Sequence, residues 1–174
     1  GVLNGDYNVV ILDRKQDQLF IFNDRFGYRR LYWYQDDDIV MFSPEIKAFL
    51  QHQGFDKTMD EQGIANYFQF YYVLGDNTLF RRIKVLPPAS YLLVDRKGVR
   101  AGSYWKPRYV PHYGIENMSE AVETGYELFV KSMRQRLDGS RNALIPLSGG
   151  LDSRLITGVA SALGHDFSTV TMGI

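Results

Sequence analysis

The chain has 174 residues, of which 45% are hydrophobic, 14% aromatic and 23% charged. These proportions are typical of a folded protein and exclude a disordered one, and the length allows one good core or two small ones. The 20 Lys and Arg residues balance the 20 Asp and Glu residues without a long block of one sign, so we expect no nucleic-acid partner.

Membrane and secretion signals are also missing from the sequence. No apolar run approaches the roughly 20 residues that span a bilayer, and the first residues lack the pattern of a signal peptide. The chain has no cysteine and therefore no disulfide, which favours a cytoplasmic location. Residue 1 is Gly and not Met, which indicates a piece of a longer protein.

The first part of the chain is predicted to be a meander of antiparallel strands followed by helices. Short β-rich runs alternate with turn residues at 7–12, 19–23, 31–34 and 39–42. Ser43, Pro44 and Glu45 then predict the start of a short helix that ends near residue 54. Asp60 predicts the N-terminus of a second helix.

An apolar stripe follows this second helix at a spacing of three and four residues. Its members are Ile64, Ala65, Phe68 and either Tyr71 or Tyr72. Such a stripe is typical of a helix packed on a sheet, so we favour core packing over an aromatic ligand site. Further strands are expected at residues 91–94 and from 98 to 105. Helices packed on antiparallel strands predict an α+β domain over residues 1–105.

The sequence changes character after residue 105. Residues 106–116 contain Pro107 and Pro111 without periodicity and are the expected linker. Asn117 and Glu120 predict a capping box for a helix that reaches residue 137. The apolar stripe of this helix consists of Val122, Tyr126, Phe129, Val130, Met133 and Leu137. A strand at 142–147, a helix at 152–163 and a strand at 167–172 form the repeating unit of a parallel α/β sheet, which we expect over residues 117–174.

The predicted strand at 142–147 runs directly into a polar, glycine-rich turn. The turn residues are Ser148, Gly149, Gly150, Asp152 and Ser153. At the carboxyl end of a parallel strand, unpaired N–H groups and the positive end of a helix dipole suit a phosphate group. A carboxylate such as Asp152 can hold Mg²⁺ together with phosphate oxygens. An ordinary strand-to-helix turn explains one Ser and one Gly, but not all five positions. The pattern also differs from the common GxxxxGK[ST] loop, because the Lys is absent.

SGGLDS after an apolar strand resembles the PP-motif of the ATP-pyrophosphatases. Other segments resemble, in order, the glutamine-hydrolysing asparagine synthetases: LNGDYNVVILD, NDRFGYRRLYW, FSPEIKAFL, NTLFRRIKVLPPASYLLV and YWKP. The resemblance covers nearly the whole chain. It implies the later part of a glutaminase domain with incomplete αββα layers of the N-terminal-nucleophile (Ntn hydrolase) fold, followed by the start of an ATP-binding synthetase domain.

The same resemblance implies a function and a set of site residues. In this family glutamine is hydrolysed at one site, and the ammonia travels through a tunnel to attack a β-aspartyl-AMP made from aspartate and ATP. It implies that Ser148, Gly149, Gly150, Asp152 and Ser153 hold the ATP pyrophosphate and Mg²⁺. It also implies that Pro146, Leu147, Met172 and Gly173 lie on the adenine and ribose side. We expect ATP and Mg²⁺ as cofactors and a homodimer as an option.

Two departures from the family pattern bear on activity. The family's glutaminase nucleophile is an N-terminal cysteine, and this chain has none, so we expect an internal fragment that hydrolyses no glutamine alone. Asn4 and Gly5 resemble an oxyanion pair, but their LNG context favours a structural role. Pro146 lacks a backbone N–H, which puts an adenine contact from this position in doubt. We expect any ATP binding by the chain alone to be weak.

Several other polar residues are given structural roles. His52, His112 and His165 lack metal-ligand spacing. Asp24, Arg25, Arg29 and Arg30 are interpreted as a charged hairpin turn, and Asp36, Asp37 and Asp38 as a solvated turn. Two alternative functions stay open. One is a relative with another acceptor, such as a β-lactam synthetase, a lasso-peptide cyclase or a sugar-modifying amidotransferase, which Arg154 mildly favours. The other is a non-catalytic scaffold domain.

Overall fold

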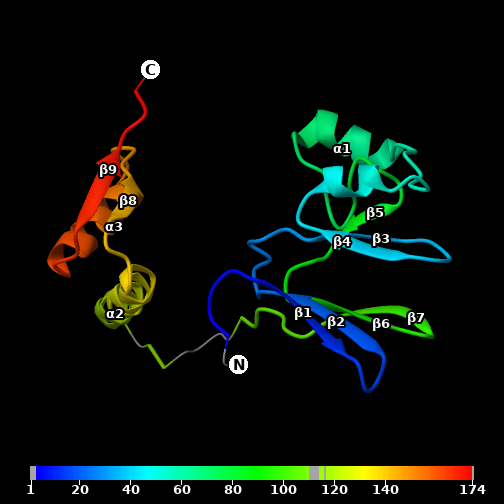
Figure 1. Cartoon of the computed structure of the whole chain (residues 1–174). Helices are drawn as coiled ribbons and strands as arrows, with labels where there is room; N and C mark the ends of the chain where they lie inside the picture. Colours follow the sequence, from blue (N-terminus) through cyan, green and yellow to red (C-terminus); the bar gives the residue numbers. More distant parts are fainter. Residues whose placement is uncertain (1–2, 110–113, 116, 174) are drawn as a thin grey trace. The chain divides into compact units, whose positions relative to one another are not determined.

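The computed structural model describes residues 3–109, 114–115 and 117–173. The chain divides into two compact units, Gly1–Arg108 and Tyr109–Ile174, which we call the first and second units (Figure 1). Pro111 and His112, in the predicted linker, lie outside the described residues. No helix in the described part of the chain is both long and apolar enough to cross a membrane.

The first unit contains a four-stranded antiparallel sheet in the order β1-β2-β6-β7. Its strands are β1 (Asn8–Asp13), β2 (Gln18–Asn23), β6 (Ser90–Asp95) and β7 (Gly98–Ser103). Aspartates make the tight turns between neighbours, because Asp13 accepts the N–H groups of Lys15 and Gln16 and Asp95 accepts that of Lys97. The predicted strands in these positions are confirmed.

A second sheet has the order β4-β3-β5 and is also antiparallel. It consists of β3 (Tyr32–Gln35), β4 (Val40–Ser43) and the unpredicted β5 (Ile83–Val85). Because β2 and β3 belong to different sheets, the prediction of one continuous meander is wrong. The segment between them crosses from one sheet to the other, so the interpretation of Asp24, Arg25, Arg29 and Arg30 as a hairpin turn is wrong as well.

Asp24 explains why this segment leaves the first sheet. Its side chain is only 3% exposed, and its Oδ2 atom accepts the N–H groups of Phe26 and Tyr28 at 3.0 and 3.3 Å. The backbone N–H of Ala89 donates to the Asp24 carbonyl at 3.0 Å. Local N–H groups satisfy one carboxylate oxygen, Oδ2, whereas Oδ1 is buried without a hydrogen-bond partner in the structure. Asp24 therefore organises the crossing between the sheets instead of marking a charged hairpin turn.

The core of the first unit consists of one cluster between the two sheets and another on the opposite face of the second sheet. Ile21 and Leu92 of the first sheet are fully buried and form one cluster with Leu31 and Leu86, against which Trp33 of the second sheet packs. A second cluster consists of Tyr34, Phe49, Phe55 and Ile83. Because Trp33 and Tyr34 are neighbours on β3, their side chains point to opposite faces, and the second sheet is covered on both. Figure 1 shows the resulting layers, with α1 beyond the second sheet.

The predicted helix after Ser43 is shorter than expected and has a different geometry. The segment is a 3₁₀ helix, η1 (Ile46–Gln51), preceded by Glu45 and without a side-chain cap. Ser43 ends β4 instead, and its hydroxyl accepts the N–H of Glu45 at 3.1 Å. The predicted helix start at Ser43 is therefore wrong by a few residues.

The next helix, α1 (Glu61–Phe70), begins as predicted, since Asp60 accepts the N–H of Gly63 at 2.6 Å. Its predicted core stripe is wrong, because Phe68 is 77% and Tyr71 85% exposed. The buried residues are Gly63 and Asn66. A Cβ atom at Gly63 would lie 2.2 Å from the carbonyl oxygen of Thr78. The absence of a side chain at Gly63 therefore lets α1 pack closely against the backbone of Thr78.

The second unit has the predicted strand-helix-strand arrangement. Its elements are α2 (Met118–Leu137), β8 (Ala143–Pro146), α3 (Leu151–Ala162) and β9 (Phe167–Val170). The two strands are parallel, with Ala143 paired to Phe167 and Pro146 to Val170. Asn117 caps α2 by accepting the N–H of Glu120 at 2.9 Å. This unit confirms the expected α/β pattern.

The small core of the second unit uses only part of the predicted α2 stripe. It consists of Met133, Leu137, Ile145, Val159 and Ala160. Val122 and Tyr126, from the first half of the stripe, are 63% and 52% exposed. The predicted helix is confirmed, whereas its N-terminal half is not part of the core.

Candidate functional site

The SGGLDS segment lies at the carboxyl end of β8, as expected from the sequence. The strand ends at Pro146, and the N–H of Leu147 donates to the carbonyl of Val170 at 2.8 Å. The chain then leaves the sheet, and α3 begins at Leu151. The same edge receives the end of β9, because the Thr171 hydroxyl donates to the Leu147 carbonyl at 2.8 Å.

The turn itself is held by short-range contacts between its polar groups. Gly149 has a φ of +81°, a left-handed conformation that glycine adopts at little cost. The Oγ atoms of Ser148 and Ser153 are 3.2 Å apart, and Ser153 donates to the carbonyl of Gly150 at 3.1 Å. The N–H of Gly150 lies 3.4 Å from the Ser148 hydroxyl. The predicted site residues therefore surround one turn.

The first turn of α3 presents backbone N–H groups at this position. Gly150 is the N-cap and makes no side-chain cap bond. The first N–H groups of a helix have no acceptor within the helix, so those of Leu151 and Asp152 point outward at the positive end of the dipole. Residues 148–152 are exposed. An anion placed here meets donors that would otherwise bind water.

Asp152 is the candidate metal ligand and lies in the first turn of α3. Among the residues that the structure describes, no three His, Asp or Glu side chains gather into a metal-binding group. A single exposed carboxylate beside phosphate-binding N–H groups fits Mg²⁺, which usually keeps water and takes one or two carboxylates together with phosphate oxygens. The donor set is unsuited to a structural zinc site.

The residues assigned to the adenine and ribose side lie at the same edge. Pro146 ends β8 and Leu147 follows it, and Met172 and Gly173 follow β9. The pairing of Pro146 with Val170 makes the two strand ends neighbours. Met172 is 95% exposed. The structure therefore brings these four residues to the edge that carries the SGGLDS turn.

Arg154 adds a charge that the pattern of the motif does not require. Its backbone N–H donates to the carbonyl of Gly150 at 3.2 Å, and its Nε lies 3.4 Å from the same oxygen. The side chain therefore folds back along α3 toward the turn. In the sequence, Arg154 stands out as a site residue because it directly follows the SGGLDS motif.

The polar groups around Asp36 have structural partners. The Oδ1 atom of Asp36 accepts the N–H groups of Asp38 and Ile39, and its Oδ2 atom accepts the hydroxyl of Tyr34 at 2.8 Å. The Tyr34 hydroxyl, followed by the N–H of Asp38, lowers the pKa of the Asp36 carboxyl. Burial is the main reason why the pKa of Tyr34 is raised. Gly5, for which the sequence favours a structural role, lies just before β1 and has a φ of +116°.

Comparison with known proteins finds a family match in each of the two units. Residues 1–105 match the family described as glutamine amidotransferase domain, and residues 124–174 match the family described as asparagine synthase. Glutamine-hydrolyzing asparagine synthetase 3 of Bacillus subtilis (strain 168) is 29% identical over 164 residues, which cover 94% of this chain and 26% of that protein.

Two further relatives show the range of the similarity. A putative glutamine-hydrolyzing asparagine synthetase 2 of Methanocaldococcus jannaschii is 27% identical over 161 residues, covering 90% of this chain and 31% of that protein. Amidase chry2 of Gibberella zeae is 25% identical over 164 residues, covering 92% and 24%. The chain thus spans between 24% and 31% of the length of these three relatives.

Proposed function

Because this chain belongs to the glutamine amidotransferase domain family and its second unit matches the asparagine synthase family, we propose that it is part of an ATP- and glutamine-dependent amide-forming ligase. The proposed product is asparagine, made from aspartate through β-aspartyl-AMP. In this proposal the first unit is a part of a glutaminase domain with N-terminal-nucleophile layers. The second unit is the beginning of an ATP-pyrophosphatase domain.

The observation that carries the proposal is the exposed SGGLDS turn at the carboxyl end of β8. In the proposed reaction, an oxygen of the aspartate side-chain carboxylate attacks the α-phosphorus of ATP. The bond between that phosphorus and the bridging oxygen to the β-phosphate breaks, and pyrophosphate leaves with the bond electrons. Ammonia then attacks the acyl carbon and loses a proton, and AMP departs with the electrons of the broken carbon–oxygen bond.

The residues of this chain act on the pyrophosphate side of that reaction. The N–H groups of Leu151 and Asp152 and the hydroxyls of Ser148 and Ser153 would hold pyrophosphate oxygens as their charge increases. Bound Mg²⁺ supplies further charge neutralisation, and Asp152 would hold it. The half-buried Leu147 and the exposed Met172, which follow the ends of β8 and β9, would carry the nucleoside.

Aspartate-dependent exchange of labelled pyrophosphate into ATP tests this function. The assay is made on the longer protein that the proposal implies, and it reports adenylation without the need for glutamine or ammonia. We expect exchange that requires both aspartate and Mg²⁺. A protein that hydrolyses glutamine but exchanges no pyrophosphate with any carboxylate acceptor would contradict the proposal.

A second candidate keeps the same chemistry and changes the acceptor. Arg154 places a cation at the beginning of α3, with its Nε 3.4 Å from the Gly150 carbonyl, and one relative is named an amidase. Both observations favour a related amidotransferase or cyclase that adenylates another carboxylate. The exchange assay separates the two candidates, because exchange would then depend on that other acid and not on aspartate.

A further inference from the structure

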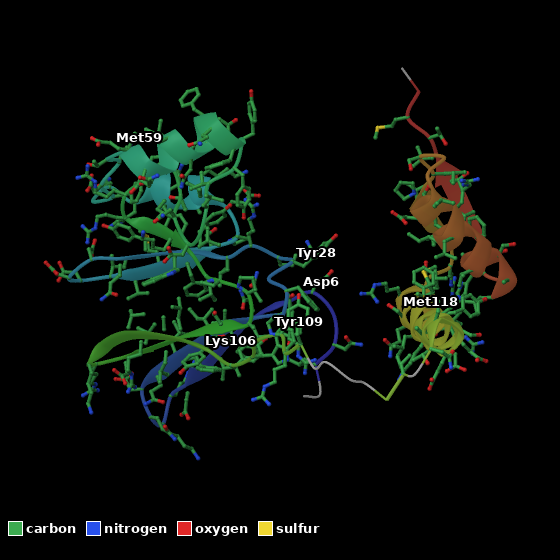
Figure 2. All side chains as sticks on the ribbon, turned by 180° about the vertical axis from the view of Figure 1, so that it is seen from behind. Asp6, Tyr28, Met59, Lys106, Tyr109 and Met118 are labelled. Atoms are coloured by element: carbon green, nitrogen blue, oxygen red, sulfur yellow. The ribbon has the colours of Figure 1, made fainter. Side chains whose placement is uncertain are left out.

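Arg154 brings a positive charge to the beginning of α3. The residue is exposed and lies in the first turn of the helix, Leu151–Ala162. Figure 2 shows the side chains of the second unit, with Met118 labelled at the beginning of α2. Side chains on a helix lean toward its N-terminus, so a long side chain at this position extends over the preceding turn. The helix therefore directs Arg154 toward the SGGLDS segment.

Contacts within the turn fix this direction. The carbonyl oxygen of Gly150 accepts the backbone N–H of Arg154 at 3.2 Å and the hydroxyl of Ser153 at 3.1 Å. The Nε atom of Arg154 lies 3.4 Å from the same oxygen. The guanidinium group is therefore held beside Gly150, the N-cap residue of α3. These contacts join residues close together in the sequence, so the position of the guanidinium follows from the turn itself.

Asp152 and Arg154 lie on different sides of the helix end. An α-helix turns by about 100° per residue, so residues two apart are separated by about 200° around its axis. An anion bound by the first N–H groups of α3 therefore has the Asp152 carboxylate on one side and the Arg154 guanidinium on the other. A carboxylate needs a bound cation to attract phosphate, whereas a guanidinium binds phosphate oxygens directly.

From this arrangement we propose that Arg154 binds the pyrophosphate part of ATP and stabilises it as the leaving group. The inference rests on the proposed function, because it takes the SGGLDS turn as the pyrophosphate site. A guanidinium group can donate two parallel hydrogen bonds to phosphate oxygens. The charge on the pyrophosphate increases as the bond to the α-phosphorus breaks, so these hydrogen bonds become stronger in the transition state.

A contact with the acceptor carboxylate is the competing role for Arg154. In displacement at phosphorus, the attacking and leaving oxygens lie roughly in line, on opposite sides of the phosphorus atom. The guanidinium lies beside the N-cap of α3, where the proposal places the pyrophosphate. It is therefore on the side of the leaving group, and its role is the same whichever acid is the acceptor.

Calorimetric titration of the proposed longer protein with magnesium pyrophosphate tests this role without turnover. We expect Arg154→Gln to weaken pyrophosphate binding about tenfold, as for the loss of a partly exposed charge-assisted contact. Arg154→Lys keeps the charge but loses the paired donors, so its affinity should lie between the two. Arg141→Gln is the matched control, because Arg141 is also exposed in the second unit but precedes β8. It should bind pyrophosphate like the unchanged protein.

Pyrophosphate exchange separates the two roles of Arg154. Arg154→Gln should raise the KM for pyrophosphate and leave the KM for the acceptor acid unchanged. Unchanged pyrophosphate affinity would overturn the inference, as would a higher KM for the acceptor alone, and Arg154→Lys gives the same test where Arg154→Gln fails to fold. In these cases the unchanged protein still exchanges pyrophosphate, so the proposed function stands. An unchanged protein that neither binds nor exchanges pyrophosphate would overturn the proposed function as well.

Discussion

The side-chain oxygens of Ser148 and Ser153 lie 3.2 Å apart, so the two ends of the SGGLDS turn meet. Ser148 precedes α3 and Ser153 lies in its first turn, and the contact closes the turn around the exposed N–H groups of the helix. Two hydroxyls beside these donors form a small polar cradle. We draw separate predictions from this arrangement for the charge and for the backbone of the turn.

Asp152→Ala in the proposed longer protein should abolish most adenylation. Loss of the carboxylate that would hold Mg²⁺ removes charge neutralisation from the departing pyrophosphate, and we expect pyrophosphate exchange to fall on the order of 100-fold. Glutamine hydrolysis, measured in the same preparation, should remain, because the proposal assigns it to a different site.

Asp166→Ala is the matched control for this change, because Asp166 is also an exposed aspartate of the second unit but lies before β9. It should leave exchange near the original rate. Equal loss of exchange and glutamine hydrolysis in a folded Asp152→Ala protein would refute the role given to this carboxylate.

Gly149→Ala tests whether the turn needs its left-handed backbone. The added Cβ meets no atom within 4 Å, so the φ of +81° is the only source of strain. We expect the free energy of unfolding to fall by about 1 kcal/mol in urea titrations. Gly158→Ala, in the interior of α3 and also without a neighbour within 4 Å, should instead raise stability by about 0.5–1 kcal/mol. A gain in stability for both variants would contradict the turn geometry.

The strands and the site turn could be predicted because their signals are local. The predicted strand at residues 7–12 differs by one residue from β1, Asn8–Asp13, since a run of apolar residues ends at an aspartate that makes its own turn. The SGGLDS turn was found in the same way, from an apolar strand followed by cap residues and a helical pattern. Both predictions depend on residues that are close together in the sequence.

The division into two sheets could not be predicted in this way. It depends on the burial of Asp24, whose carboxylate receives the N–H groups of Phe26 and Tyr28. An aspartate among arginines is most often exposed, so the sequence indicated a charged hairpin turn. The partner segment around Ala89 is 65 residues away in the chain, since Ala89 donates its N–H to Asp24. The residues around Asp24 in the sequence do not indicate this contact with Ala89.

The orientation of α1 was missed for a related reason, and it leads to a third prediction. Gly63→Ala places a Cβ 2.2 Å from the Thr78 carbonyl oxygen, so the helix must shift. We expect a loss of about 1–3 kcal/mol in the free energy of unfolding, as for overpacked cores. Gly125→Ala in α2, where the Cβ meets nothing within 4 Å, should be neutral or stabilising.

Phe68→Ser provides the opposite test of the same orientation. The side chain is 77% exposed, so the substitution should change the free energy of unfolding of the chain by less than about 0.5 kcal/mol. A large loss for Phe68→Ser together with a tolerated Gly63→Ala would mean that the aromatic stripe, as the periodicity indicates, is the buried face.

The turn around Asp36 should make stability depend on pH in the acid range. The hydroxyl of Tyr34 and the N–H groups of Asp38 and Ile39 favour the charged carboxylate, and its pKa is lowered from the model-compound value of 3.8. A group whose pKa is lower in the folded state stabilises that state above its unfolded pKa. This contribution is lost as the pH falls from about 4 through the lower folded pKa.

Asp36→Asn should therefore be less stable than the original chain at pH 6, and the difference should shrink toward pH 2 to 3 in urea titrations. Asp37→Asn removes the same charge from the neighbouring residue and should retain the pH dependence of the original chain. If the stability difference for Asp36→Asn were the same at both ends of this range, the hydrogen bonds to the carboxylate would not be the source of the effect.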